Sequence, residues 1–228
     1  MRKKSKTIIR LIYLVLFILL CIGLVIAFLN MFKVKTIETN VSPALMNYFP
    51  NLDSDLIFFV NQEKIRRYFL NDPTLESVSI ERKYPDTLFI NVNRRVQVAT
   101  VLAKNGNYKV DSSGFIFDTI ATSSAFPRIH QEDKNLNVGN NITHKSLKIA
   151  IESLNYSNQK GIRFIDIYEG ENDTARMILN TGIVVIIGTN LPSEDIISSL
   201  QTLLKNITIE GNTVKEIDFR FDKPFISL

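Results

Sequence analysis

The sequence predicts an α+β protein with one N-terminal transmembrane helix, then a β-α-α-β-β module, and finally a mixed β-sheet domain with packed helices. An uncharged apolar run predicts the transmembrane helix. The next stretch alternates between strand and helix patterns, and the rest combines many strand patterns with two amphipathic helices. The boundaries that we expect are a basic tail at 1–10, a span at 11–29, a first module at 34–95 and a second at 96–228.

The apolar run is LIYLVLFILLCIGLVIAFL, 19 residues without a charge. At 1.5 Å per residue a helix of this length measures about 28 Å, close to the hydrocarbon thickness of a bilayer. A cleaved signal peptide would have a shorter apolar stretch followed by a small-x-small site. Bulky residues such as Phe28 and Leu29 end this run instead, so we expect an uncleaved membrane anchor.

Charge around the run predicts its orientation. Five basic residues and no acidic ones occupy the first ten positions, whereas only Lys33 and Lys35 follow the run closely. The N-terminus is therefore expected in the cytoplasm and the bulk of the chain outside it, held by a single pass through the cell membrane. The only cysteine, Cys21, lies within the run, which excludes a disulfide framework and a cysteine-based metal site.

The first module begins with a strand pattern at Val34–Thr39 and a helix around Ala44–Tyr48. Asn61 is placed to cap a second helix that ends near Leu70. Two strands follow, Leu75–Arg82 and Thr87–Asn93, joined by a turn that contains Pro85.

The second module is expected to contain a strand at Val96–Lys104 and a hairpin closed by Ser112-Ser113-Gly114. Its better helix spans Glu194–Lys205, with Ser193 as the cap and acidic residues in the first turn. The other elements expected here are a helix at Lys145–Leu154 and strands at Ile162–Tyr168, Ala175–Leu179, Ile183–Ile187, Val214–Phe221 and Pro224–Leu228.

Composition argues against several classes of ligand. Beyond the first ten residues, 22 Lys and Arg face 23 Asp and Glu, so the globular part has no basic footprint for nucleic acid. The two histidines, His130 and His144, lack ligand-spaced partners and are expected at the surface, so no metal site is predicted. No G-x-G pair indicates a phosphate loop, and no cofactor is predicted.

One tetrapeptide resembles a catalytic motif. Ser157-Asn158-Gln159-Lys160 matches the S-x-x-K of penicillin-binding enzymes, but the accompanying S-D-N and K-T-G segments are missing. We expect a solvated helix end here and no enzymatic activity. Binding is the default function, and the last strand is a candidate because an open sheet edge accepts an extended segment of a partner.

Several motifs, in order along the chain, resemble the bacterial division proteins FtsQ and DivIB. A stretch typical of the family's first exported module is followed by V-D-x-x-G-x-x-F, F-P-x-I and a closing I-D-F-R-F segment. The residues that carry the resemblance are Arg82, Pro85, Thr87, Leu88, Ile90, Val92, Arg95, Ala99, Val110, Asp111, Gly114, Phe117, Phe126, Pro127, Ile129 and 217–221.

This resemblance implies that 34–95 form a POTRA domain and that a β domain of the FtsQ type follows. It also implies a non-enzymatic scaffold at the division septum, which joins FtsB-like and FtsL-like single-span partners to the machinery of septal peptidoglycan synthesis. In relatives the edge near the closing motif accepts a strand from FtsB. By position, the partner-binding residues of this chain would be Phe221, Lys223, Phe225 and Ile226.

Two alternatives stay open at this point. The first is a membrane-anchored cell-wall enzyme, or a direct regulator of one. The only sequence feature that supports it is the candidate catalytic pair Ser157 and Lys160. A POTRA-type chaperone or translocation adaptor would contain several POTRA units in tandem, whereas only one can be fitted to the sequence.

Overall fold

The computed structural model describes residues 2–40, 55–121, 125–210, 213–221 and 223–227. Its contacts divide the chain into two compact units, Met1–Arg94 and Arg95–Leu228. The helix expected around Ala44–Tyr48 lies outside the described residues.

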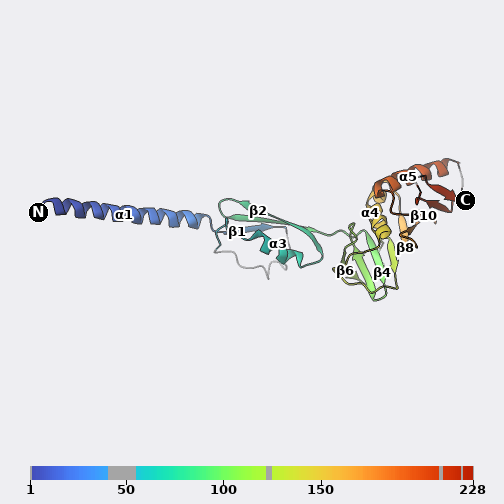
Figure 1. Ribbon diagram of the computed structural model, residues 1–228, viewed down its shortest axis with the longest axis horizontal. Coiled ribbons are helices and arrows are strands. Elements are labelled where there is room, and N and C mark those ends of the chain that lie inside the picture. The colour runs from blue at the N-terminus through green and yellow to red at the C-terminus, as the bar shows by residue number, and fades with distance from the viewer. Residues whose placement is uncertain (1, 41–54, 122–124, 211–212, 222, 228) are drawn as a thin grey trace. The chain divides into compact units, whose positions relative to one another are not determined.

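The chain begins with one long helix, α1 (Arg2–Met31) (Figure 1). Within Leu11–Met31 an 18-residue window has a mean hydropathy of 3.2, and none of that window is buried against the rest of the protein. By length and composition Leu11–Met31 is a candidate membrane span, two residues longer than the predicted one.

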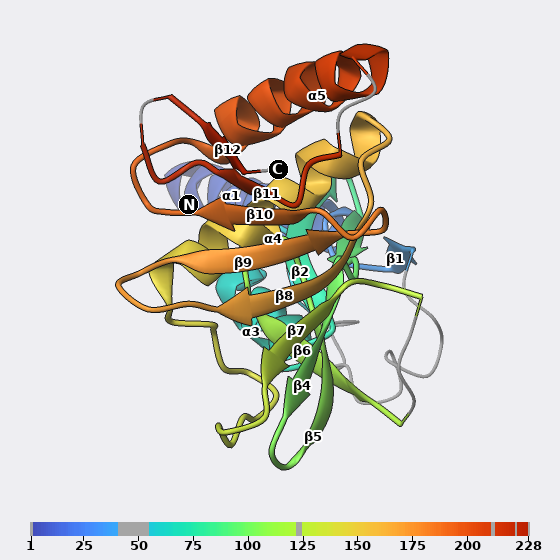
Figure 2. The same cartoon turned by 90° about the vertical axis from the view of Figure 1, so that its right-hand side faces the viewer.

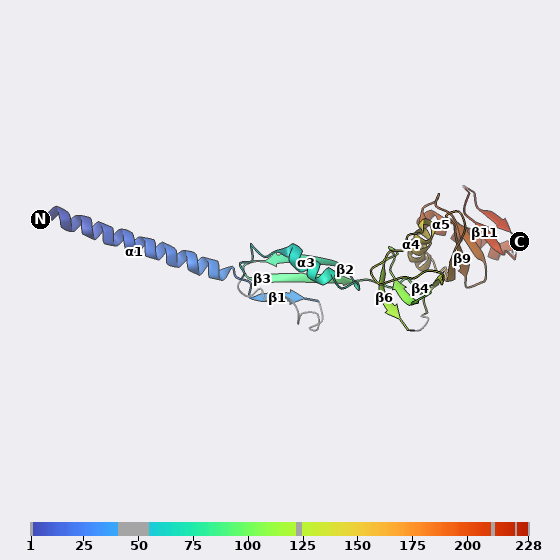
Figure 3. The same cartoon turned by 60° about the horizontal axis from the view of Figure 1, so that its bottom comes forward.

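A three-stranded sheet forms the centre of the first unit, in the order β1-β3-β2. Strand β3 pairs in parallel with β1 and antiparallel with β2, and α3 covers one face (Figure 3). These elements span β1 Thr36–Thr39, α3 Gln62–Leu70, β2 Leu75–Lys83 and β3 Thr87–Arg94.

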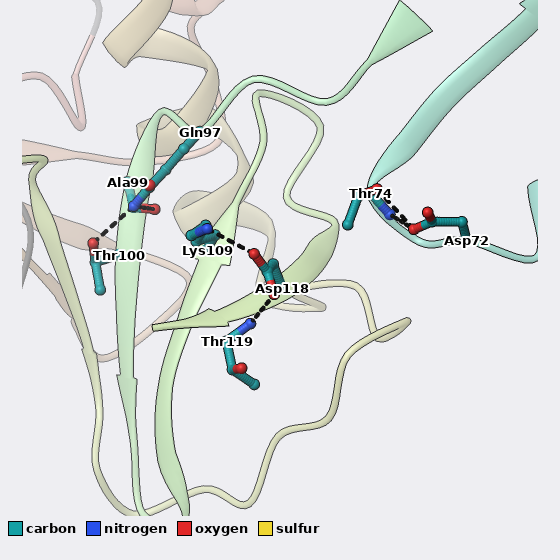
Figure 4. A network of polar contacts seen from close by, with 8 residues as sticks. All are labelled: Asp72, Thr74, Gln97, Ala99, Thr100, Lys109, Asp118 and Thr119. Carbon is teal, nitrogen blue, oxygen red and sulfur yellow. Dashed lines mark hydrogen bonds and ion pairs between the residues drawn. The ribbon is translucent and has the colours of Figure 1, made fainter. Parts of the chain in front are cut away.

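Local side-chain bonds set both ends of α3. The Asn61 side chain accepts a hydrogen bond from the Lys64 backbone N–H at 3.0 Å, as the sequence predicts for a cap. Beyond the helix, Asp72 Oδ1 accepts from the Thr74 backbone N–H at 2.9 Å and from its hydroxyl at 2.7 Å, which turns the chain into β2 (Figure 4).

Alternation along β3 builds the core of the first unit. Leu88, Ile90 and Val92 are all buried on one face of the strand, as the period-2 pattern predicts. On β2, Leu75 and Val78 are both buried although they are three residues apart. A register shift between Leu75 and Ser77 explains this spacing, because a bulge returns the following side chains to the core face.

The second unit is a nine-stranded mixed sheet in the order β12-β11-β10-β9-β8-β7-β4-β5-β6 (Figure 2). Its strands span β4 Ala99–Ala103, β5 Gly106–Val110, β6 Ile116–Ile120, β7 Arg128–Gln131, β8 Phe164–Glu169, β9 Ala175–Leu179, β10 Val184–Ile187, β11 Glu216–Asp218 and β12 Phe225–Ser227.

Two helices pack on this sheet, α4 (Lys145–Gln159) and α5 (Ser193–Glu210). Ser193 does not cap α5 as predicted, because it is already the first residue of that helix. Its hydroxyl donates to Glu152 Oε2 on α4 at 2.9 Å, so the side chain links the two helices instead.

Strand β7 is absent from the sequence prediction. At four residues it is too short for its alternation to stand out, and only Ile129 and Gln131 are buried. Its place comes from tertiary pairing, since it lies between β4 and β8 and runs parallel to both. The sheet is therefore continuous across the second unit.

The Asp111 carboxylate holds the turn between β5 and β6. Its Oδ1 accepts from the Ser113 N–H at 2.9 Å, the Ser113 hydroxyl at 2.7 Å and the Phe115 N–H at 3.0 Å. Its Oδ2 accepts from Arg95, whose guanidinium lies 4.0 Å over the Phe115 ring. Gly114 provides the positive φ of 81° that the turn requires. Farther along the hairpin, Lys109 and Asp118 form an ion pair at 2.6 Å (Figure 4).

We expect Asp111→Ala to destabilise the second unit by about 3 kcal/mol, because it leaves the partly buried Arg95 charge and two backbone N–H groups without their acceptor. Asp111→Asn keeps an acceptor for the turn and should cost less. The urea midpoint of the detergent-solubilised chain, followed by circular dichroism, measures both losses. Asp133→Ala, at an exposed acid, is the control. Equal urea midpoints for Asp133→Ala and Asp111→Ala would contradict the stabilising role of Asp111 in the turn.

Candidate functional site

The last strand, β12, forms one edge of the nine-stranded sheet. It pairs antiparallel with β11, with Ile217 opposite Ile226 and Asp218 opposite Phe225. Among the described residues no strand pairs with its other side. Ser227 O accepts from the Lys215 N–H at 3.0 Å, and alternate residues of a strand direct their backbone groups to opposite sides. The N–H and C=O of Ile226 therefore face the open edge.

All four predicted binding residues lie at the surface around this edge. Phe225 is 68% exposed, Phe221 is 59% exposed and Ile226 is 36% exposed, and Lys223 is also exposed. We call Phe221, Lys223 and Phe225–Ser227 the carboxyl-terminal edge. It presents two aromatic rings beside the side of β12 that does not pair with β11.

The strand predicted at Val214–Phe221 is shorter in the structure, where β11 ends at Asp218. Phe219 is the side chain that enters the core, at 1% exposure, and Phe221 follows it in the segment that leads to β12. Pro224 stands immediately before β12, so its missing N–H falls outside the strand.

Asp218 and Arg220 form a tight contact at the start of this segment. Arg220 donates to Asp218 through Nε at 2.9 Å and Nη2 at 2.6 Å, and its backbone N–H also donates to Oδ1 at 2.9 Å. The Arg220 carbonyl accepts from Asn190 at 3.0 Å, which ties the segment to the loop before α5. The chain that carries Phe221 is thereby held at its base. From the sequence, Arg220 belongs only to a family motif, and nothing there predicts this role.

The electrostatics of Asp218 follow from this contact. Burial acts to raise the pKa of its carboxyl, but the hydrogen bonds and charge of Arg220 outweigh burial and hold the pKa below the ordinary 3.8. The carboxylate is therefore ionised at neutral pH, and it contributes stability through Arg220 in that form.

Two other edges in the described residues, β6 and β2, differ from β12. Strand β6, at the far edge of the same sheet, is covered in part by the 139–141 segment, since Ile116 exchanges backbone hydrogen bonds with Asn140 and Gly139 at 2.9 and 2.8 Å. Strand β2, at an edge of the first unit, carries charged side chains such as Glu81 and Lys83. Charge and covering segments are the usual protection of an edge, and β12 has neither along its three residues.

The two histidines are less exposed than predicted, at 16% and 18% for their side chains. His130 lies between Asp166 and Glu132, at 2.7 and 2.9 Å, and stacks on Tyr168 with 4.2 Å between ring centroids. Within the described ranges no group of three potential ligands is arranged to hold a metal ion. This cluster is a polar network on the sheet, in which Arg128 also reaches Asp166 at 2.7 Å.

The S-x-x-K tetrapeptide does not assemble a nucleophile. The Ser157 hydroxyl is buried and donates to the Leu154 carbonyl at 3.0 Å, inside its own helix. Lys160 extends toward α5 and donates to Ser198 at 3.0 Å. Neither group is directed at the other, and both have structural partners.

Comparison with known families bears on the first unit and the start of the second. Residues 43–119 match the family model described as POTRA domain, FtsQ-type. The match runs past Arg94, where the first compact unit ends, and reaches into β6. No curated protein matches the chain significantly.

The fold and this match together define a POTRA-domain protein with one candidate N-terminal membrane helix and a large mixed sheet. That combination fits an FtsQ/DivIB-like protein, as the sequence motifs predict. The FtsQ-type POTRA family is a division-associated family of non-enzymatic scaffolds.

The lowered pKa of Asp218 gives a pH prediction with a definite sign. The stability contributed by the Asp218–Arg220 contact should be fully present above the unfolded pKa and lost as pH falls through the folded pKa, which lies below 3.8. We expect the difference in urea midpoint between wild type and Asp218→Asn to be constant from neutral pH to about pH 5 and to shrink below it.

Subtracting the urea midpoint of the variant from that of the wild type removes the effect of other carboxyls with lowered pKa, such as Asp166 and Glu169. These groups titrate in both proteins. A midpoint difference that does not change across the acid range would contradict this assignment.

Proposed function

We propose that the protein is a membrane-anchored scaffold of the bacterial division machinery that binds single-span partners at its carboxyl-terminal edge and helps to assemble and regulate septal peptidoglycan synthesis. The single observation that carries the proposal is the open edge of β12, where Ile226 directs its backbone groups to solvent beside exposed Phe225. The FtsQ-type POTRA match supports the division context.

The mode of binding is strand addition. An extended segment of an FtsB-like partner pairs with the free N–H and C=O of Ile226, while its side chains contact Phe225 and Phe221. With three residues, β12 offers few main-chain bonds, so the aromatic side chains provide much of the affinity. An FtsL-like protein joins the same assembly through its FtsB-like partner.

In this proposal the anchor holds the carboxyl-terminal edge outside the cytoplasm. Candidate span Leu11–Met31 follows a tail that carries five basic residues in its first ten positions, which favours a cytoplasmic N-terminus. The scaffold is then held at the cell membrane by a single pass, and its recruitment directs it to the division septum.

No observation favours the enzymatic alternative, because Ser157 and Lys160 are bonded to Leu154 and Ser198. The adaptor alternative needs POTRA units in tandem, and the family model matches one such domain in this chain. Assembly by contact is the function that the site supports best.

Two substitutions at the edge test the proposal. Ile226→Pro removes the outward N–H, and the loss of one net hydrogen bond of about 1 kcal/mol should weaken partner binding about fivefold. Phe225→Asp places a charge where the partner's apolar side chains pack and should abolish co-purification with the FtsB-like partner. The readouts are co-purification from membranes and recruitment of a fluorescent fusion to midcell.

Val96→Asp is the matched control, since Val96 is 72% exposed and lies just before β4, six strands from β12 in the sheet order. It should bind and localise as the wild type does. Normal co-purification of the Phe225→Asp and Ile226→Pro variants would show that the partner binds elsewhere.

A further inference from the structure

The turn at Leu56–Phe59 directs two adjacent phenylalanines outward. Phe58 is 44% exposed and Phe59 is 81% exposed, whereas their neighbours Ile57 and Val60 are buried at 0% and 2%. The Phe59 N–H donates to the Leu56 carbonyl at 2.8 Å and closes the turn. Because the flanking residues belong to the core, the outward position of both rings is fixed by packing.

Two more aromatic residues adjoin this turn. Phe58 stacks on Tyr84 with 5.4 Å between ring centroids, and it lies 5.0 Å from Phe32. Tyr84 is itself 57% exposed. We call Phe32, Phe58, Phe59 and Tyr84 the aromatic rim. Exposing such a cluster to water gives no favourable burial of apolar surface. Its exposure therefore indicates an apolar or interfacial environment.

The rim is tied to the residue that follows the candidate span. Phe32 comes one position after Met31, the last residue of the span. Its carbonyl accepts from the Ile57 N–H at 2.8 Å, and Lys33 forms a backbone bridge with Leu56.

Further contacts on both sides hold the link between Phe32 and the Leu56–Phe59 turn. Phe32 also packs against Phe28 of α1, at 4.7 Å between centroids. On the far side of the turn, Arg82 donates to the Val60 carbonyl at 3.1 Å. Chain connectivity therefore keeps the rim at the end of the span, whatever angle α1 takes.

We propose that the aromatic rim inserts into the interfacial region of the bilayer that holds α1, between the lipid headgroups and the acyl chains. Tyrosine and phenylalanine rings suit this zone, where one side is apolar and the other is wet. Lys33, two positions beyond the candidate span, is placed to reach the phosphate layer with its ammonium group, whereas the Lys35 ammonium pairs with Asp86 at 3.2 Å. The inference goes beyond partner binding and rests on the anchor of the proposed function.

Lipid is the occupant that the geometry favours, because Phe32 directly follows the candidate membrane span and backbone bonds hold the Leu56–Phe59 turn beside it. The docked rim would hold the first unit at a fixed depth at the membrane surface. A helix of a partner, or a second copy of this chain, would need to be present at the same place, and both are absent from dilute vesicles that contain this protein alone.

The chain contains no tryptophan, so a single introduced one reports on one position only. Phe59→Trp places the probe at the tip of the turn. Leu70→Trp is the control, because Leu70 is 41% exposed and ends α3 just before the start of β2, whereas the rim adjoins the other end of that strand, about 26 Å away. Tyr84→Trp repeats the probe on a second element of the rim.

The full-length variants are reconstituted at low protein-to-lipid ratio in phosphatidylcholine and phosphatidylglycerol vesicles, with and without lipids brominated along the acyl chains. For F59W and Y84W we expect an emission maximum at shorter wavelength than that of L70W. We also expect greater quenching by brominated lipid and less by aqueous iodide. Emission of both rim probes that matches L70W in all three measurements would overturn the proposal.

Flotation of the same samples tests membrane anchoring separately from insertion of the rim. Vesicles that carry the protein upward while the rim probes stay water-exposed overturn the rim proposal alone. Failure of the wild-type chain to float with vesicles overturns the anchor and the rim together. Blue-shifted probes that appear only at high protein density indicate contact between copies, and they overturn lipid as the occupant.

Discussion

A β-sheet that is not closed must end in strands with unpaired backbone groups. This constraint governs the two edges of the sheet in the second unit. Nine strands lie in one continuous sheet, so two edges have to be covered, charged or used. The β6 edge is bonded by the 139–141 segment, whereas β12 leaves Ile226 open and adds the exposed rings of Phe225 and Phe221. An edge of this kind is a hazard in isolation and a binding surface in an assembly.

The charged motif residues that point to the family prove to be structural residues. Asp111 holds the β5–β6 turn and pairs with Arg95, and Asp218 with Arg220 fixes the base of the segment that leads to β12. Arg82 bonds the carbonyl beside the aromatic turn. Removing one partner of such a pair is costly, because it leaves a buried charge uncompensated. The proposed binding residues, by contrast, are exposed and have few described contacts within the chain.

Sequence reasoning succeeds where one local signal decides the outcome. The alternation of Leu88, Ile90 and Val92 places β3 in the core, and the Asn61 cap starts α3 where it is expected. It fails where tertiary pairing decides, as for β7, whose four residues become a strand only between β4 and β8. It also overestimates the strand before β12, since alternation cannot tell Phe219, which enters the core, from Phe221, which does not.

From the sequence the last strand is a candidate edge, but the binding residues come only from the family motif, because an open edge is a property of the whole sheet. The aromatic rim has a visible signal, two adjacent phenylalanines in a turn, but its link to Phe32 and Tyr84 requires the fold. The first unit thus carries a surface suited to lipid beside the candidate span, and the second unit carries one suited to a partner strand at β12.

Hydrogen exchange at the Ile226 amide tests the central claim most directly. Its N–H faces away from β11, so it should exchange rapidly in the protein alone and become protected when the FtsB-like partner binds. Rapid exchange at Ile226 in the saturated complex, with protection gained on another element, would contradict strand addition at this edge.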